Sequence, residues 1–274
     1  MTTLALSAPR FAGFARMRQD APLLTALGIG MTLSLLPTLA AMQVDDRLFQ
    51  GDSIWLKPVK FQIALAIYLL TLAFYARWLS EATRQARWFR LYCGTVAAAI
   101  IGEVLWIGGA AALGTASHFN VSSPVWSALY GFMGVAAVTL TSAAPVFGLA
   151  IWRNRATGLP DALHLAVALG LVLTFVLTVP VAGYMSSTPG HFVGTPADWD
   201  TGLPLMGWSR SVGDLRVAHF LATHALHGIP LAGLIAVLTL RQVAARQAVL
   251  LASALYAALV VATFVQALAG QPFL

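Results

Sequence analysis

Long apolar runs separated by short polar connections dominate the chain from residue 21 onward. Seven of these runs reach about 20 residues, the length that an α-helix needs to cross the ~30 Å hydrocarbon core of a bilayer. They cover residues 21–42, 60–79, 92–114, 125–151, 162–184, 215–240 and 247–269. The pattern predicts an all-α integral membrane protein built as a seven-transmembrane-helix bundle.

The composition agrees with a membrane protein, because 59% of the residues are hydrophobic and only 9% are charged. We expect one membrane domain over residues 21–269, with short tails at residues 1–20 and 270–274. The net charge of +6 does not indicate a nucleic-acid partner, since the basic residues are scattered between apolar runs. The lipid bilayer is the predicted partner. With Cys93 as the single cysteine, redox chemistry would need a cofactor or a metal.

The connections between the runs alternate in charge. Eleven of the sixteen Lys and Arg residues fall at residues 1–20, 77–90, 153–155 and 241–246, and the opposite set of loops is net acidic. Because cytoplasmic loops carry an excess of Lys and Arg, we expect a cytoplasmic N-terminus and a C-terminus outside. A cleaved signal peptide is the alternative for the first run, but its apolar stretch is longer than such peptides use, which favours an uncleaved helix.

Histidine is concentrated near the predicted outer ends of the helices. His164 is the exception, at the cytoplasmic start of the fifth run, where we expect it to cap a helix or lie at the interface. The five outer histidines are His118, His191, His219, His224 and His227. At 100° per residue, the last three share one broad face of the sixth helix, and at 1.5 Å per residue His227 would lie about 18 Å below the outer boundary.

Glu103 lies within the third run, about 16 Å below its outer end, at a depth similar to that of His224 and His227. An ionisable side chain at the centre of a transmembrane helix costs about 2.5–3.5 kcal/mol and faces a partner or a wet cavity. We therefore predict a shared, outward-facing site that includes His219, His224 and Glu103. Two plainer interpretations stay open: a protonated Glu103 bonded to a hydroxyl or carbonyl group, and histidines that only make interhelical hydrogen bonds.

Imidazole is the commonest metal ligand and the usual axial ligand of haem. The site is therefore predicted to hold a metal ion (Zn, Cu or Fe) or haem b. In the metal hypothesis Glu103 is a further ligand or the catalytic proton acceptor. The predicted metal ligands are His191, His219, His224 and His227.

In the haem hypothesis, His118 and His219 hold the cofactor from two sides. Arg216 then binds a propionate or an anionic substrate, and pairing of Arg216 with an outer acid is an equal alternative. Asp214 is expected to start the sixth helix by accepting backbone N–H bonds. The outer loop 185–214, which is too long for an ordinary turn, is predicted to form a packed cap.

The sequence HGIP, residues 227–230, predicts a break in the sixth helix, because Pro230 cannot bond the carbonyl of Leu226. Broken helices at mid-membrane are also typical of transporter binding sites. In the second run, Lys57 and Lys60 are interpreted as lipid-headgroup anchors. The seventh run has no lysine for a retinal Schiff base, which argues against a rhodopsin.

The segments SIWLKPVKFQ, SHFN and GDLRVAHFLATHAL together resemble a family of bacterial multi-pass inner-membrane proteins with no established activity. The resemblance covers most of the chain and implies a location in the bacterial inner (plasma) membrane. A looser likeness connects the chain with seven-helix zinc-dependent membrane hydrolases, which combine three histidines with a Ser and an Asp. This chain lacks their His-x3-His pair, so the likeness shows only that a seven-helix fold can house a metal.

These features lead to three hypotheses. The first is a membrane oxidoreductase or metal-dependent hydrolase that acts on a small or lipophilic substrate from the outer side. The alternative is a proton-coupled small-molecule transporter that uses Glu103 and the sixth-helix histidines. The second alternative is a sensory or structural subunit of a membrane complex.

Overall fold

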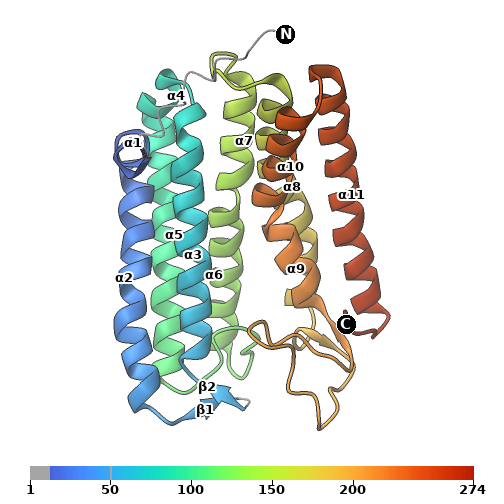
Figure 1. Cartoon of the computed structure of the whole chain (residues 1–274). Helices are drawn as coiled ribbons and strands as arrows, with labels where there is room; N and C mark the ends of the chain where they lie inside the picture. The colour runs from blue at the N-terminus through green and yellow to red at the C-terminus, as the bar shows by residue number, and fades with distance from the viewer. Residues whose placement is uncertain (1–12, 50) are drawn as a thin grey trace. The chain divides into compact units, whose positions relative to one another are not determined.

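The computed structural model describes residues 13–49 and 51–274, which divide into two compact units at residue 117. Almost all of the regular structure in this part of the chain is helical, which confirms the all-α fold (Figure 1). Six helices are long and apolar enough to cross a membrane, and a bent helix pair makes a seventh span if it is counted as one. The chain is therefore a multi-pass membrane protein.

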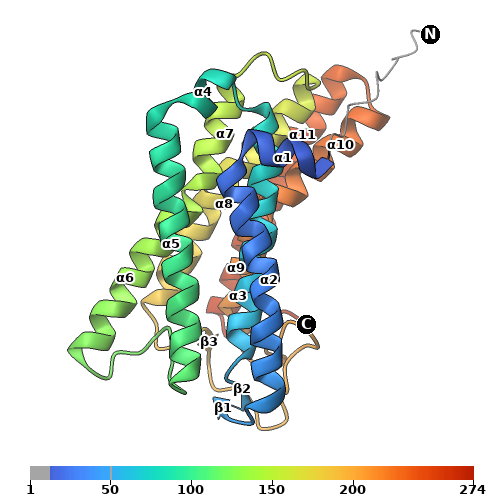
Figure 2. The same ribbon diagram turned by 90° about the vertical axis from the view of Figure 1, so that its left-hand side faces the viewer.

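The first unit, up to residue 117, contains three long helices. Its elements are α1 (Gly13–Asp20), α2 (Pro22–Val44), β1 (Leu48–Phe49), β2 (Asp52–Ser53), α3 (Leu56–Tyr75), the 3₁₀ turn η1 (Ala76–Trp78), α4 (Glu81–Gln85) and α5 (Arg87–Ala112). Helix α3 packs against both α2 and α5. Figures 1 and 2 show α2 and α3 side by side, with the antiparallel β1 and β2 at one end and α1 at the other. Residues 1–12 of the predicted tail lie outside the described residues, and the remainder forms α1.

Buried aliphatic side chains hold the three long helices together. Leu69, Leu72 and Ile100 are completely buried. Gly28 lets α2 approach α3 closely, because a Cβ atom there would lie 2.8 Å from Cγ of Leu70. Small residues at helix contacts are the usual means of close packing within a bilayer, where the solvent is as apolar as the side chains.

A cluster of hydrogen-bonded polar side chains connects the ends of α2, α3 and α5 near the β1–β2 hairpin. Asp45 accepts hydrogen bonds from Nη2 of Arg47 (2.8 Å) and from Nε1 of Trp55 (2.9 Å), and Nη1 of Arg47 donates to the carbonyl of Ala112 (3.1 Å). The bonds from Arg47 and Trp55 hold the pKa of Asp45 well below its usual range. This end of the unit is therefore fixed by charge-assisted bonds outside the apolar span.

The second unit, from residue 118, is arranged around one central helix. Its elements are α6 (Pro124–Thr141), α7 (Ala143–Arg153), α8 (Asp161–Ser186), β3 (Phe192–Val193), β4 (Gly213–Asp214), α9 (Leu215–Thr223), α10 (Ala225–Thr239) and α11 (Gln242–Leu268). Helix α8 packs against α7, α9, α10 and α11, and α11 also packs against α9 and α10. Helices α6 and α7 together make one span-length stretch.

His164 connects two helices of this unit. Its Nε2 donates to the carbonyl of Ile151 (2.7 Å), which lies in the last turn of α7, and its ring stacks on Trp152 with 5.6 Å between centroids. The expectation that His164 caps its own helix is wrong, because the N-cap residue of α8 is Pro160, and the side chain bonds the last turn of α7 instead.

The predicted spans agree with the observed helices within a few residues, but two of them each consist of two helices. The fourth span consists of α6 and α7, and the sixth consists of α9 and α10, which meet at an angle of 52°. The break in the sixth span falls at His224, and α10 continues through Pro230. The break predicted at HGIP, residues 227–230, therefore occurs, but it lies three residues before His227.

Candidate functional site

The break in the sixth span is centred on a histidine. His224 lies between α9 and α10 with φ −95° and ψ 3°, in the sparsely allowed bridge region where many active-site residues are found. Its backbone N–H donates to the carbonyls of Phe220 (3.1 Å) and Leu221 (3.2 Å), which closes α9. The backbone therefore changes direction at a side chain that can carry a proton or bind a metal.

Side chains add further hydrogen bonds to the two carbonyl groups that accept the backbone N–H of His224. The carbonyl of Phe220 accepts from Nδ1 of His224 (2.8 Å) and from Oγ1 of Thr223 (2.9 Å). The carbonyl of Leu221 accepts from the hydroxyl of Tyr256 on α11 (2.8 Å). An unsatisfied backbone group costs several kcal/mol in lipid, so these bonds explain how the break is tolerated.

The neighbouring helix also explains why the break lies before HGIP. A Cβ atom on Gly170 of α8 would come within 2.7 Å of Cδ of Pro230 and 2.9 Å of the carbonyl oxygen of Ala225. The bend thus packs closely against α8 because Gly170 has no side chain. The proline predicts that a break occurs nearby, and its exact residue is set by contacts with α8 and α11.

Two of the three histidines of the sixth span lie close together beside this break. The rings of His224 and His227 lie 5.5 Å apart, and His224 stacks on Phe220 at 4.0 Å. The bend replaces the straight helix from which a face shared with His219 was predicted.

Hydrogen bonding selects the tautomer of His224. Because its Nδ1 lies against a carbonyl oxygen, this nitrogen must carry the hydrogen, and Nε2 carries the lone pair of the neutral ring. Nδ1 of His219 is buried and has no hydrogen-bond partner among the described residues. The second unit therefore presents imidazole nitrogens that can accept or donate protons in the apolar region.

The structure gives the predicted metal site no support. Within residues 13–49 and 51–274, no group of three or more His, Cys, Asp or Glu side chains is arranged to hold a metal ion. Of the outer histidines, His191 packs on Phe192 with 4.1 Å between ring centroids, and His118 lies 6.0 Å from the ring of Tyr130.

Asp214 and Arg216 form the start of α9. Asp214 is 1% exposed, and it accepts hydrogen bonds from the backbone N–H (3.0 Å) and Nε (2.9 Å) of Arg216 and from the backbone N–H of Ser209 (3.0 Å). Nη2 of Arg216 pairs with Asp214 at 2.6 Å and also donates to the carbonyl of Gly207. The predicted capping role of Asp214 is confirmed. Arg216 was predicted to pair either with an acid or with an anionic ligand, and in the structure it pairs with the acid Asp214.

The loop 187–214 is organised around Asp200. This carboxylate accepts bonds from the hydroxyls of Ser209 (2.5 Å) and Ser211 (2.6 Å) and from nearby backbone N–H groups. The two hydroxyls, with the backbone N–H groups of Gly202 and Arg210, hold the pKa of Asp200 well below its usual range. The loop is thus internally bonded, as expected of a packed cap.

Tryptophans contribute unequally to this loop. Trp208 packs on Phe220 (5.4 Å) and Phe273 (5.9 Å), whereas Trp199 is 63% exposed. Trp208 therefore fixes the loop to α9, and Trp199 does not help to pack it.

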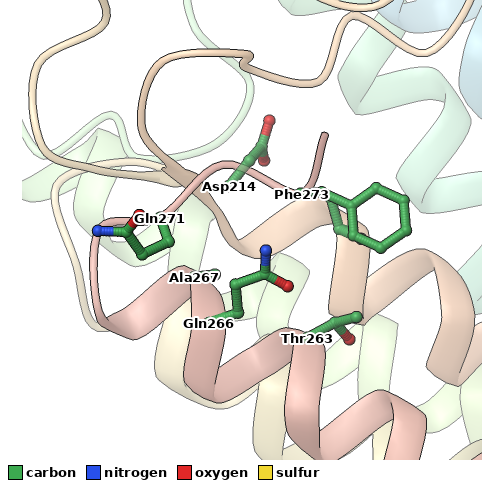
Figure 3. Close-up of a pocket in the computed structure, with 7 residues that line it drawn as sticks. Asp214, Thr263, Gln266, Ala267, Gln271 and Phe273 are labelled. Carbon is green, nitrogen blue, oxygen red and sulfur yellow. The ribbon is translucent and has the colours of Figure 1, made fainter.

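A small crevice lies where this loop meets the end of α11 (Figure 3). Its lining residues are Asp214, Val217, Thr263, Gln266, Ala267, Gln271 and Phe273. Gln266 donates to the carbonyl of Pro272 (2.6 Å), which folds the C-terminal segment back onto α11. None of the histidines lines this crevice, and its bonds fix the C-terminal segment in place.

Glu103 belongs to the first unit. It is 2% exposed, and neither of its carboxyl oxygens has a hydrogen-bond partner among the described residues. The plainer interpretation, a protonated Glu103 bonded to a hydroxyl or carbonyl, therefore has no partner group there.

Gln62, which was not among the predicted site residues, is also buried in this unit. Its Nε2 donates to Oγ1 of Thr38 (2.8 Å) and to the carbonyl of Ser34 (3.3 Å), while its Oε1 has no hydrogen-bond partner among the described residues. In the sequence, an amide side chain within the apolar run after Lys57 and Lys60 could have indicated a buried polar residue. With Thr38 and Glu103, Gln62 shows that α2, α3 and α5 each bring a polar side chain into the interior of the first unit.

Comparisons of the chain with models of known protein families, with curated proteins and with solved structures give no match.

Proposed function

We propose that the protein is a proton-coupled carrier of small molecules in the bacterial inner membrane, with its N-terminus in the cytoplasm and its C-terminus outside. The observation that carries the proposal is the discontinuous sixth span, whose break is a histidine flanked by two more histidines. In secondary transporters, broken helices at mid-membrane place binding groups and backbone dipoles beside the substrate. Ionisable residues within spans commonly serve as proton relays.

Each unit would contribute one ionisable element to such a carrier. In the second unit, Nε2 of His224 can take up a proton while the bond from Nδ1 to Phe220 keeps the ring oriented. In the first unit, Glu103 is buried and accepts no hydrogen bond from the described residues. A carrier needs ionisable groups within its spans, and each unit has at least one.

Proteoliposomes loaded with the fluorescent pH indicator pyranine test the proposal. Amino acids, sugars and organic cations would be added outside one at a time, and the internal pH followed. We expect at least one class of compound to move protons with the wild type, and a loss of more than about tenfold in rate in His224→Ala and Glu103→Gln. His191→Ala, a change in the outer loop, is the matched control and should keep the wild-type rate.

A metal- or haem-dependent membrane enzyme is the second candidate, and the tautomer of His224 favours it. Metal-binding histidines usually donate their second ring N–H to a carbonyl or carboxylate, as Nδ1 of His224 does. The visible spectrum and the elemental content of the detergent-purified protein separate the two candidates. A reducible haem band, or stoichiometric zinc, copper or iron lost in His224→Ala, would favour the enzyme over the carrier.

A further inference from the structure

We infer that the start of α5 binds an anionic phospholipid, with Arg87 and Arg90 on the phosphate and Leu91 beside an acyl chain. Helix α5 is long and apolar enough to be a span, so its first residues lie where headgroups meet hydrocarbon. They belong to the end of the first unit that lies opposite the β1–β2 hairpin (Figure 1). The inference goes beyond the proposed function, because lipid binding here requires neither proton transfer nor a substrate.

Several arginines at this end of the unit already have partners within the protein. Asp20 of α1 accepts hydrogen bonds from Nε of Arg16 (3.1 Å) and from Nη1 of Arg84 (2.7 Å). Nε of Arg77 donates to the carbonyl of Phe74 (3.0 Å), and its guanidinium group lies 4.0 Å from the centroid of the same residue's ring. These three arginines therefore connect parts of the fold with one another.

Arg87 and Arg90 differ from them. Both are exposed, and neither guanidinium group has an ion pair or hydrogen bond with another of the described residues. The first turn of α5 contains no acidic residue. In α4, which leads directly into α5 (Figure 2), Glu81 accepts a hydrogen bond from Nε2 of Gln85 (2.7 Å). The two arginines therefore leave a local positive charge that an anion from outside the chain can neutralise.

Helical spacing places this charge at the head of an apolar stripe. Arg87 and Arg90 are three residues apart, so they are neighbours on the helix surface, with a rise of about 4.5 Å between them. Leu91 follows Arg87 by four residues on the same face and is 63% exposed. Leu105 follows Arg87 by five full turns and is 70% exposed. One face of α5 thus presents charge at the membrane boundary and hydrocarbon below it.

This combination fits an anionic phospholipid. Guanidinium groups bind phosphate through paired N–H bonds, and basic residues beside a span attract anionic lipids. Trp88, in the same turn, is 57% exposed and is of the residue type that lies at headgroup level. A soluble phosphate or an acidic peptide would contact the arginines alone, whereas a phospholipid also covers the apolar stripe that begins at Leu91.

Native mass spectrometry of the full-length protein in detergent tests the inference. The protein is mixed with dioleoylphosphatidylglycerol or with dioleoylphosphatidylcholine, whose acyl chains are identical, and the lipid-bound fraction is measured at each concentration. We expect the wild type to bind phosphatidylglycerol about tenfold more tightly than phosphatidylcholine. In Arg87→Gln/Arg90→Gln the two lipids should bind within about twofold of each other. Equal binding of the two lipids to the wild type would overturn the inference without any variant.

Arg241→Gln/Arg246→Gln is the matched control, because it removes the same charge near the start of another span, α11. Both arginines are exposed, but Arg241 precedes the helix and Arg246 lies in its second turn, so they do not form a pair on one turn. We expect this variant to keep the wild-type preference for phosphatidylglycerol. A loss as large as that in Arg87→Gln/Arg90→Gln would overturn the inference, because net charge and not the α5 site would then set the preference.

Soluble competitors distinguish a lipid site from a site for other anions. Glycerol 3-phosphate and an acidic decapeptide carry negative charge without acyl chains, so neither should displace phosphatidylglycerol when added at an equal concentration. Displacement by glycerol 3-phosphate would make the site one for soluble phosphates, and displacement by the peptide would make it a protein-docking surface. Either result would overturn the assignment to a phospholipid.

Discussion

Glu103 in the first unit and Asp214 in the second are two carboxyl groups buried to almost the same extent, at 2% and 1% exposure. Asp214 accepts bonds on both oxygens, from Arg216 and from the backbone of Ser209. Glu103 accepts none from the described residues. Burial alone therefore does not distinguish a structural carboxylate from one available for chemistry, whereas hydrogen bonding does.

Isosteric amides should separate the two carboxyl groups most strongly. Asp214→Asn removes the negative partner of Arg216 and places an N–H₂ group among donors, and we expect a loss of about 3 kcal/mol in the free energy of unfolding. Glu103→Gln breaks no hydrogen bond and should change it by less than about 1 kcal/mol. Denaturant titrations in mild detergent, followed by circular dichroism, measure both. Equal losses would mean that Glu103 is also a structural group.

Removal of the charged partner of Asp214 should have a smaller effect than Asp214→Asn. Arg216→Met leaves Asp214 its backbone donors but removes the charged ones, which should cost about 2 kcal/mol in the free energy of unfolding. The same titrations measure this loss, and a loss as large as that in Asp214→Asn would mean that the backbone donors contribute little.

Asp200 sharpens the comparison as a third carboxyl, and its effect is the smallest. The pKa of Asp200 is depressed, so its ionised form stabilises the loop 187–214 above the unfolded value of about 3.9, and this contribution disappears as the pH falls through the folded value. Hydrogen exchange in residues 197–212, corrected for intrinsic rates, should therefore increase between pH 7 and pH 3. In Asp200→Asn the protection should already be reduced at pH 7 and should change less on acidification.

The sequence alone determined the membrane character and the positions of the spans. Apolar runs of membrane-spanning length are a one-dimensional property, because each helix satisfies its own backbone bonds in lipid. The sequence also predicted Asp214 as the N-cap residue of α9, since an N-cap side chain bonds to backbone N–H groups two or three residues away. It also placed His224 and His227 close together, because they are near in sequence.

Only the tertiary structure decided what those residues face. The break lies at His224 because Tyr256 of α11 bonds the carbonyl of Leu221 and because Gly170 of α8 leaves space for Pro230. Gln62 of α3 donates to Oγ1 of Thr38 on α2 although 24 residues separate them. Sequence patterns report which face of a helix is polar. The partner that meets that face is set by packing between helices that are distant in the chain.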